Sequence, residues 1–281
     1  MSTTAMSTTE TLILGAIAGS TIALGLPVAR VRRTTLGMRA GTTALATGIL
    51  VFLLWDVLSN GVDPVETALE ARSWGTFAFR AALLAGGFAA GLMSLVYYDW
   101  WLKCRRASPM IGPGAAAVEE FARNELAGLS PARQLALLIA TGIGLHNFGE
   151  GLAIGQSAAA GKVALALVLI IGFGLHNSTE GFGVTGPLAA EDERPSWRFL
   201  ALLGLIGGGP TFLGTVVGYA WVSVALQVAF FALAAGSILY VVTELVAVCR
   251  RFSMPTLVAW MILLGIALGF ATDFVLTAAG A

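Results

Sequence analysis

The chain has 281 residues, of which 57% are hydrophobic and 11% are charged, and its mean hydropathy is +0.84. Soluble domains carry about 25% charged residues, so this composition excludes an ordinary water-soluble enzyme. Sixteen basic and sixteen acidic residues balance, so no basic surplus indicates nucleic acid as a partner.

Eight apolar segments follow one another along the chain, and each is long enough to cross a bilayer, which takes about 20 residues. The stretch before the first segment has no basic residue and no small-residue cleavage site, so we expect a retained span rather than a signal peptide. The sequence predicts an all-α polytopic membrane protein with a single transmembrane domain, residues 1–281. Its predicted spans are 11–29, 40–58, 74–98, 134–158, 163–188, 197–219, 222–248 and 255–279.

Basic residues are distributed very unevenly between the two sides of these spans. Only Arg72 and Lys162 fall on one side, with Arg80 just inside the third span. Since basic loops stay in the cytoplasm, the pattern predicts both termini on the extracellular or periplasmic side of the plasma (inner) membrane. It also places the long loop 103–133, which we expect to be a tether with one surface helix, in the cytoplasm. The thirteen basic residues of the predicted cytoplasmic side are Arg30, Arg32, Arg33, Arg39, Lys103, Arg105, Arg106, Arg123, Arg133, Arg194, Arg198, Arg250 and Arg251.

Spans four and five contain near copies of one segment, thirty residues apart. GIGLHNFGEG at 142–151 and GFGLHNSTEG at 172–181 share the pattern G-x-G-L-H-N-x-x-E-G, and they contain the only two histidines of the chain. Residues four apart lie on the same face of a helix, so each histidine lies over the glutamate of its own copy. The connection 159–162 is short, so the two spans are expected to be antiparallel neighbours with both motifs near the bilayer midplane.

These facing side chains predict a metal site made of His146, Glu150, His176 and Glu180. An acidic side chain inside a membrane costs at least about 2.5 kcal/mol, and a divalent cation would neutralise two of them. Two imidazoles and two carboxylates suit Zn²⁺, and also Fe²⁺, Mn²⁺ or Cd²⁺. The alternatives are satisfied packing contacts and bis-histidine haem ligation, for which glutamates one turn away are poorly placed.

At these residues the sequence resembles the ZIP (Zrt/Irt-like) family of divalent metal-ion transporters, in particular its bacterial members. That family shows HNxPEG in span four and a related motif in span five, and the resemblance continues over Glu180–Pro187 and Ala234–Leu245. It implies eight spans with both termini outside, zinc uptake into the cytoplasm by alternating access, and a homodimer. The metal is then a substrate rather than a cofactor, and the chain is not an enzyme.

The resemblance also implies roles for particular residues. His146, Glu150, His176 and Glu180 would form the primary transport site, and Asn147 and Asn177 would line a second site that the same two glutamates bridge. The family's span-six glutamate is replaced by Thr211, so we expect one strong metal site and a second that is weak or absent. Gly149 and Thr179 stand where the family motifs have proline. Spans 1, 4, 5 and 6 would form the transport unit, and spans 2, 3, 7 and 8 the scaffold and dimer face.

Three other acidic residues lie near predicted span ends. Asp56 and Asp273 are interpreted as solvated helix ends, with a metal-attracting vestibule as the alternative, and Glu244 as a partner of nearby basic residues or part of an exit path. Two rival functions use the same His/Glu cluster. A membrane metalloenzyme needs an open coordination position and a separate general base, for which spans four and five offer no candidate. A metal-binding sensor would bind the ion without moving it.

Overall fold

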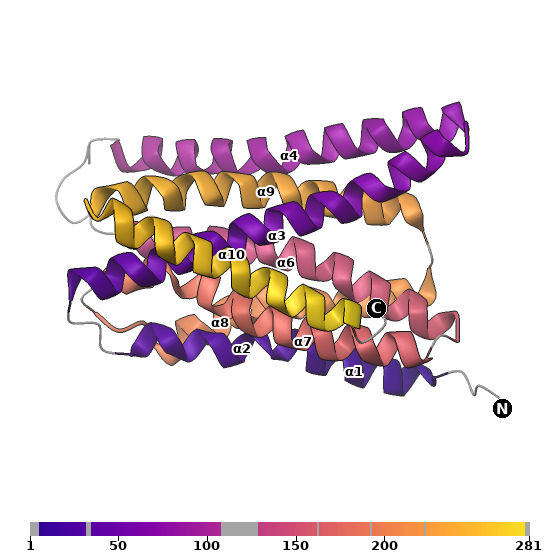
Figure 1. Ribbon diagram of the computed structural model, residues 1–281, viewed down its shortest axis with the longest axis horizontal. Coiled ribbons are helices and arrows are strands. Elements are labelled where there is room, and N and C mark those ends of the chain that lie inside the picture. The colour runs from indigo at the N-terminus through magenta and orange to yellow at the C-terminus, as the bar shows by residue number, and fades with distance from the viewer. Residues whose placement is uncertain are drawn as a thin grey trace, which may run out of the picture.

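The computed structural model describes residues 6–31, 35–107, 129–161, 163–191, 193–221 and 223–278, and these residues form helices without any strand (Figure 1). The N-terminal segment is divided into α1 (Thr8–Ser20), α2 (Ile22–Gly25) and the 3-10 helix η1 (Leu26–Arg30), and a second 3-10 helix, η2 (Pro187–Ala190), follows α7. The long helices are α3 (Leu36–Glu70), α4 (Trp74–Ala107), α6 (Pro131–Ala159), α7 (Val163–Thr185), α8 (Trp197–Ala220), α9 (Val224–Arg251) and α10 (Pro255–Ala278).

Within the described residues, seven helical segments are long and apolar enough to cross a membrane. They are the segment from Thr8 to Arg30 and helices α3, α4, α6, α8, α9 and α10. This confirms the prediction of an all-α polytopic membrane protein. Helix α7 is not among the seven, so the predicted span 163–188 stays a prediction.

The helices form two bundles that lie side by side. In the first, which we call the α3 bundle, α3 packs on α9 and α10, and α9 packs on α4. In the second, the α6 bundle, α6 packs on α7 and α8, and the segment from α1 to η1 covers α7 and α8. The bundles meet where α6 lies against α9 and where α7 lies against α3 and α10. The largest apolar core, which includes Leu50, Ile143 and Ile238, fills this junction.

Glycines bring helix backbones into direct contact inside each bundle. In the α6 bundle Gly19 faces the backbone of Gly208, and Gly151 faces that of Thr211, so closely that a Cβ would clash. In the α3 bundle Gly48 meets the backbone of α10 in the same way, and Gly91 that of α9. Small residues let membrane helices approach and gain packing energy, so each bundle is tightly joined.

Contacts across the junction are made by side chains instead. The nearest neighbour of Gly149 is the ring of Phe231, that of Gly183 is the side chain of Leu50, and that of Gly142 is Ser237 Cβ at 3.5 Å from a built Cβ position. Among the glycines that the structure describes, those at the junction therefore do not bring one backbone against another. At these glycines the bundles meet through side chains, whereas the helices inside each bundle meet through their backbones.

Two segments differ from the predicted spans. Helix α3 continues to Glu70, although residues 59–70 were expected to form a loop, because hydropathy marks the hydrocarbon thickness and not the helix length. The first span is interrupted at Thr21, whose N–H and hydroxyl both donate to Ala18 O, three residues back, as in a 3-10 turn. Of the predicted loop 103–133, residues 108–128 lie outside the described residues.

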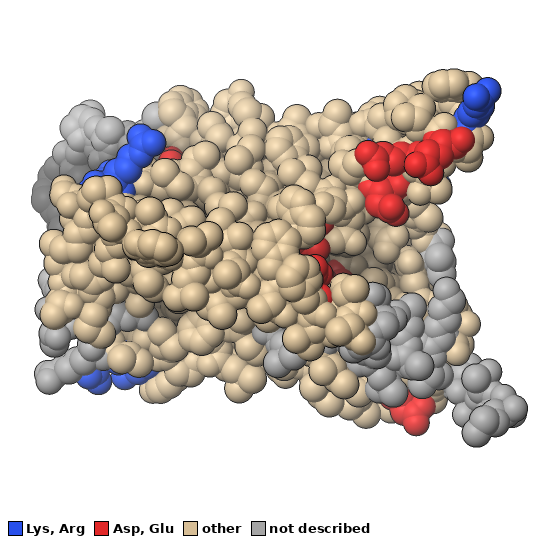
Figure 2. Space-filling model, viewed as in Figure 1, with Lys and Arg blue, Asp and Glu red and all other residues tan. Residues whose placement is uncertain are grey.

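Acidic and basic side chains gather at opposite ends of the bundles. Figure 2 shows acidic side chains at the mouth of a hollow and inside it, at the end where α3 finishes and α1 begins, whereas most of the visible basic side chains lie at the opposite end. Helix α1 starts at the same end at which α10 finishes (Figure 1).

Candidate metal centre

Helices α6 and α7 hold all six predicted metal-site residues. Ser130 caps α6 by accepting a hydrogen bond from Arg133 N, and Pro131 occupies the first turn, where it needs no donor. At its other end the chain reverses at Gly161, whose φ of +71° is favourable only for glycine. Helices α6 and α7, which carry the two motif copies, lie against each other.

Three of the predicted ligands meet inside the α6 bundle. His146 Nε2 lies 3.2 Å from Glu150 Oε1 on its own helix and 3.8 Å from Glu180 Oε1 on α7. The exposed fractions of these residues are 1%, 3% and 0%. Two carboxylates and one imidazole thus lie together away from solvent. Ionised carboxylates are stable in such a place only if a positive charge compensates for their lost hydration.

The two motif asparagines each donate a hydrogen bond to a backbone carbonyl of a neighbouring helix. Asn147 Nδ2 donates to Gly207 O on α8, and Asn177 Nδ2 donates to Ala18 O on α1, each at 3.0 Å. Both acceptors lie next to helix irregularities, one before Pro210 and the other at the break between α1 and α2. These hydrogen bonds orient each amide and tie α1 and α8 to the site.

The side-chain carbonyl oxygen of each asparagine takes no part in these hydrogen bonds. Asn147 Oδ1, Asn177 Oδ1 and Glu150 Oε2 are buried and have no hydrogen-bond partner among the described residues. Buried polar atoms are normally satisfied, so three such oxygens on the two motif copies suit an oxygen-seeking cation. The side-chain amide of Asn147 also lies beside the carboxylate of Glu180, which joins the asparagine to the cluster.

His176 lies on α7 at the expected helical position, but its side chain is outside the described part of the structure. Among the described side chains, no group of three or more His, Cys, Asp or Glu residues is placed so that it could hold a metal ion. The cluster of His146, Glu150 and Glu180 therefore stays a prediction as a ligand set, with His176 as its fourth member.

Two residues at the site were not predicted from the sequence. The ring of Phe231, on α9 of the α3 bundle, lies with its centroid 6.4 Å from that of His146. A built Cβ on Gly149 would lie 2.5 Å from Phe231 Cε1, so glycine at this motif position makes room for the ring. The other is Ala18, whose backbone carbonyl is the acceptor for Asn177. No motif in the sequence indicates either residue. The one indication is Gly149 itself, which stands where the family motif has proline.

Thr211, Asp56 and Asp273 lie on three other helices. Thr211 is fully buried on α8, and its Oγ1 has no partner among the described residues. Asp56, on α3, lies within electrostatic range of His146, Glu150 and Glu180, and Asp273, on α10, within range of Asp56. The carboxylate of Asp56 also accepts a hydrogen bond from Asn60 Nδ2 at 3.2 Å.

Comparison with known proteins gives one family match. A family model described as ZIP zinc transporter matches residues 119–277, which is more than half of the chain and includes both motif copies. No curated protein matches the chain.

Proposed function

The chain belongs to the ZIP zinc transporter family, and from this membership we propose that it carries Zn²⁺ into the cytoplasm through the cluster on α6 and α7. Membership itself makes the chain a membrane-embedded transporter of divalent metal ions and not an enzyme. The proposal adds the ion, the site, the direction and the way in which the ion moves.

One observation carries the proposed site: His146 lies within 4 Å of two buried carboxylates that come from different helices, at 3.2 Å from Glu150 and 3.8 Å from Glu180. A divalent cation balances two carboxylates and accepts the imidazole nitrogen as a further ligand. With His176 the set has two nitrogen and two oxygen donors, which suits tetrahedral Zn²⁺. In this proposal the ion replaces its water ligands by these four groups.

The packing of the two bundles supports alternating access. Backbone contacts at glycines hold each bundle together, whereas side chains such as Phe231 and Leu50 form the junction. We propose that the α6 bundle carries the bound ion past the α3 bundle as a rigid body. Domains are known to rotate as rigid bodies about an interface and to slide along packed helices.

The charge distribution supports the direction of transport. The acidic end of the molecule contains a pocket with Asp63 and Glu66 at its edge, and Asp56 lies between this end and the cluster. Negative potential attracts cations to such an opening. With the basic end in the cytoplasm, both termini and the acidic entrance face outward, and the ion enters the plasma (inner) membrane from outside.

We further propose that two copies of the chain associate through the outward faces of α4 and α10. Large apolar side chains are exposed there, among them Phe79 on α4 and Trp260 and Phe274 on α10. These helices belong to the α3 bundle, so a dimer through them would leave the α6 bundle free to move. The mass of the purified protein in detergent, after subtraction of bound detergent, tests this.

Metal counting and uptake on the same variants test the proposed site. We expect Glu150→Gln and Glu180→Gln to abolish ⁶⁵Zn uptake into vesicles. Loss of a residue that only supports a ligand lowers metal affinity roughly 10- to 100-fold, and we expect these two variants to lose more zinc affinity than that. Glu70→Gln is the matched control, because Glu70 is exposed at the end of α3. Retained uptake in both site variants would remove the site, and binding without uptake by the unchanged protein would favour a sensor.

Competition establishes the ion. Zn²⁺ is expected to displace bound Cd²⁺, and Fe²⁺ and Mn²⁺ are expected to compete only in large excess, because nitrogen donors favour Zn²⁺ over Mn²⁺. Equal competition by all four ions would leave a divalent metal transporter without zinc preference.

A further inference from the structure

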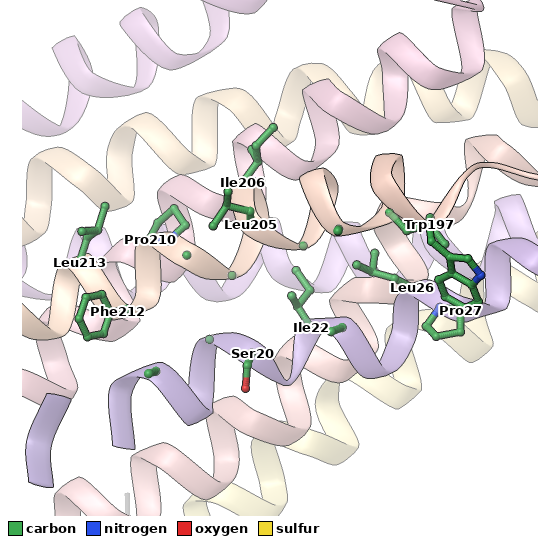
Figure 3. A pocket seen from close by; sticks show the side chains of 18 residues that line it. Ser20, Ile22, Leu26, Pro27, Trp197, Leu205, Ile206, Pro210, Phe212 and Leu213 are labelled. Carbon is green, nitrogen blue, oxygen red and sulfur yellow. The ribbon is translucent and has the colours of Figure 1, made fainter. Parts of the chain in front are cut away.

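An apolar groove runs along the outer surface of the α6 bundle, between the α1–α2–η1 segment and α8 (Figure 3). It extends from Phe212 and Leu213 at one end to Trp197 and Pro27 at the other. Its lining has one polar side chain, that of Ser20, whose hydroxyl already donates to Ile17 O. Both walls belong to segments that can cross a membrane, so the groove opens to hydrocarbon and only an apolar occupant fits it.

The groove is long enough to hold an acyl chain. Sixteen residues of α8 separate Trp197 from Leu213, which corresponds to about 24 Å of helix. Three of the four glycines in its lining are already covered by the neighbouring helix, since Gly208 and Gly19 lie against each other and Gly204 faces Leu26.

Basic side chains stand at one end of the groove. The guanidinium of Arg30 lies 4.7 Å over the ring of Trp197 and donates to Pro195 O, and Arg198 is exposed on the next residue. Of the acidic residues that precede Trp197, Glu191 is paired with Arg133 at 3.2 Å, and the side chain of Glu193 is 90% exposed. Tryptophan and arginine at the end of a span mark the interface with lipid headgroups, and positive charge there attracts anionic ones.

We propose that this groove binds one acyl chain of an anionic phospholipid, with its headgroup at Arg30 and Arg198. A chain entering from that interface covers about half of the roughly 30 Å hydrocarbon layer, which brings it past Ala201 to the crossing of Gly19 and Gly208. The bound chain packs against both α1 and α8 there. Ala18, next to Gly19, accepts the hydrogen bond of Asn177, so the lipid stabilises the wall of the metal site. This inference does not depend on the proposed ion or ligand set.

Lipid retention in the full-length protein tests the groove. The protein is purified in a neutral detergent, titrated with phosphatidylglycerol or phosphatidylcholine, and examined by native mass spectrometry. We expect one phosphatidylglycerol per chain and no retained phosphatidylcholine. Ala201→Trp fills the groove and is expected to abolish retention, whereas Leu202→Trp, at the same depth on an exposed face outside the groove, is expected to preserve it.

Arg198→Gln tests the headgroup contact separately. Removal of one basic side chain beside an anionic lipid is expected to weaken retention about fivefold. Equal retention of the two lipids, or unchanged retention in Ala201→Trp, would overturn the proposal. So would a loss of the dimer mass in Ala201→Trp alone, because the groove would then hold a second copy. Zinc bound per chain is measured on the same samples, so a failure of the metal site is distinguishable.

Discussion

Gly149 on α6 and Phe231 on α9 form a contact between the two bundles at the metal site. The ring of Phe231 occupies the space that a side chain on residue 149 would need, since a Cβ there would lie 2.5 Å from Cε1 and 3.0 Å from Cδ1. The same ring lies next to His146. The α3 bundle therefore reaches the predicted ligands through an aromatic ring that offers no donor to a metal.

Gly149→Ala is expected to slow zinc transport while zinc binding persists. The added methyl group pushes the ring of Phe231 away from α6, and overpacking of this kind costs about 1–3 kcal/mol of stability. Uptake rates, zinc counts and the unfolding midpoint in detergent measure these effects. The double variant Gly149→Ala/Phe231→Leu should recover transport, because leucine leaves space for the methyl group. A single variant that transports like the wild type would show that the contact does not restrain the bundles.

Much of the candidate site follows from spacing alone. An offset of four residues places His146 over Glu150, and a short connection makes α6 and α7 neighbours. The approach of His146 to Glu180 could therefore be predicted from the sequence. The hydrogen-bond acceptors of the two asparagines could not be predicted, because Ala18 and Gly207 accept through their backbone carbonyls and their side chains give no indication of this. Their positions depend on how α1 and α8 pack.

The fold was predictable to the extent that hydropathy measures hydrocarbon thickness. Polar residues after position 58 were interpreted as a loop, yet α3 continues through Pro64 to Glu70. Arg80, on α4, donates to Pro64 O at 2.8 Å, which fixes this polar extension against the neighbouring helix. The break at Thr21 was equally hidden, because threonine is compatible with a continuous membrane helix and forms the break only through its bonds to Ala18 O.

Asn177→Asp is expected to destabilise the protein in the absence of metal. Aspartate lacks the amide hydrogens that bond to Ala18 O, so a buried carboxylate oxygen would face a carbonyl oxygen, at a cost of about 1–3 kcal/mol. Thermal unfolding in detergent with a chelator measures the loss. Zinc should restore more stability to this variant than to the wild type, since the added charge favours the bound ion. An unchanged midpoint would mean that the hydrogen bond to α1 contributes little.

The ion pair between Arg133 and Glu191, at the start of α6, is expected to contribute more to stability than the exposed pair between Arg133 and Glu193. Arg133 Nε lies 3.2 Å from Glu191 Oε2, and Ser130 Oγ also donates to Glu191, whose side chain is 13% exposed. Glu193 approaches Arg133 at 3.9 Å but its side chain is 90% exposed. Glu191→Gln should lower stability by about 1–2 kcal/mol, and Glu193→Gln should have no measurable effect. Denaturant unfolding compares the two. Equal losses would show that geometry and burial do not distinguish the pairs.

Thr211→Glu is expected to raise the number of zinc ions bound per chain from one to two. Thr211 follows Gly207 by four residues and so shares the face of α8 on which Gly207 O accepts the hydrogen bond of Asn147. The new carboxylate would add one negative charge beside the buried oxygens of Asn147 and Asn177, where a second divalent ion otherwise lacks balancing charge.

Thr211→Gln is the matched control, because glutamine has the same length as glutamate without its charge. A built Cβ on Gly19 of α1 lies 3.1 Å from Thr211 Cβ, so both variants test the available space equally, and only the glutamate should bind the second ion. Metal analysis after gel filtration gives the stoichiometry. If both variants bind one ion, position 211 does not complete a second site; if both bind two, the oxygen atom rather than the charge is sufficient.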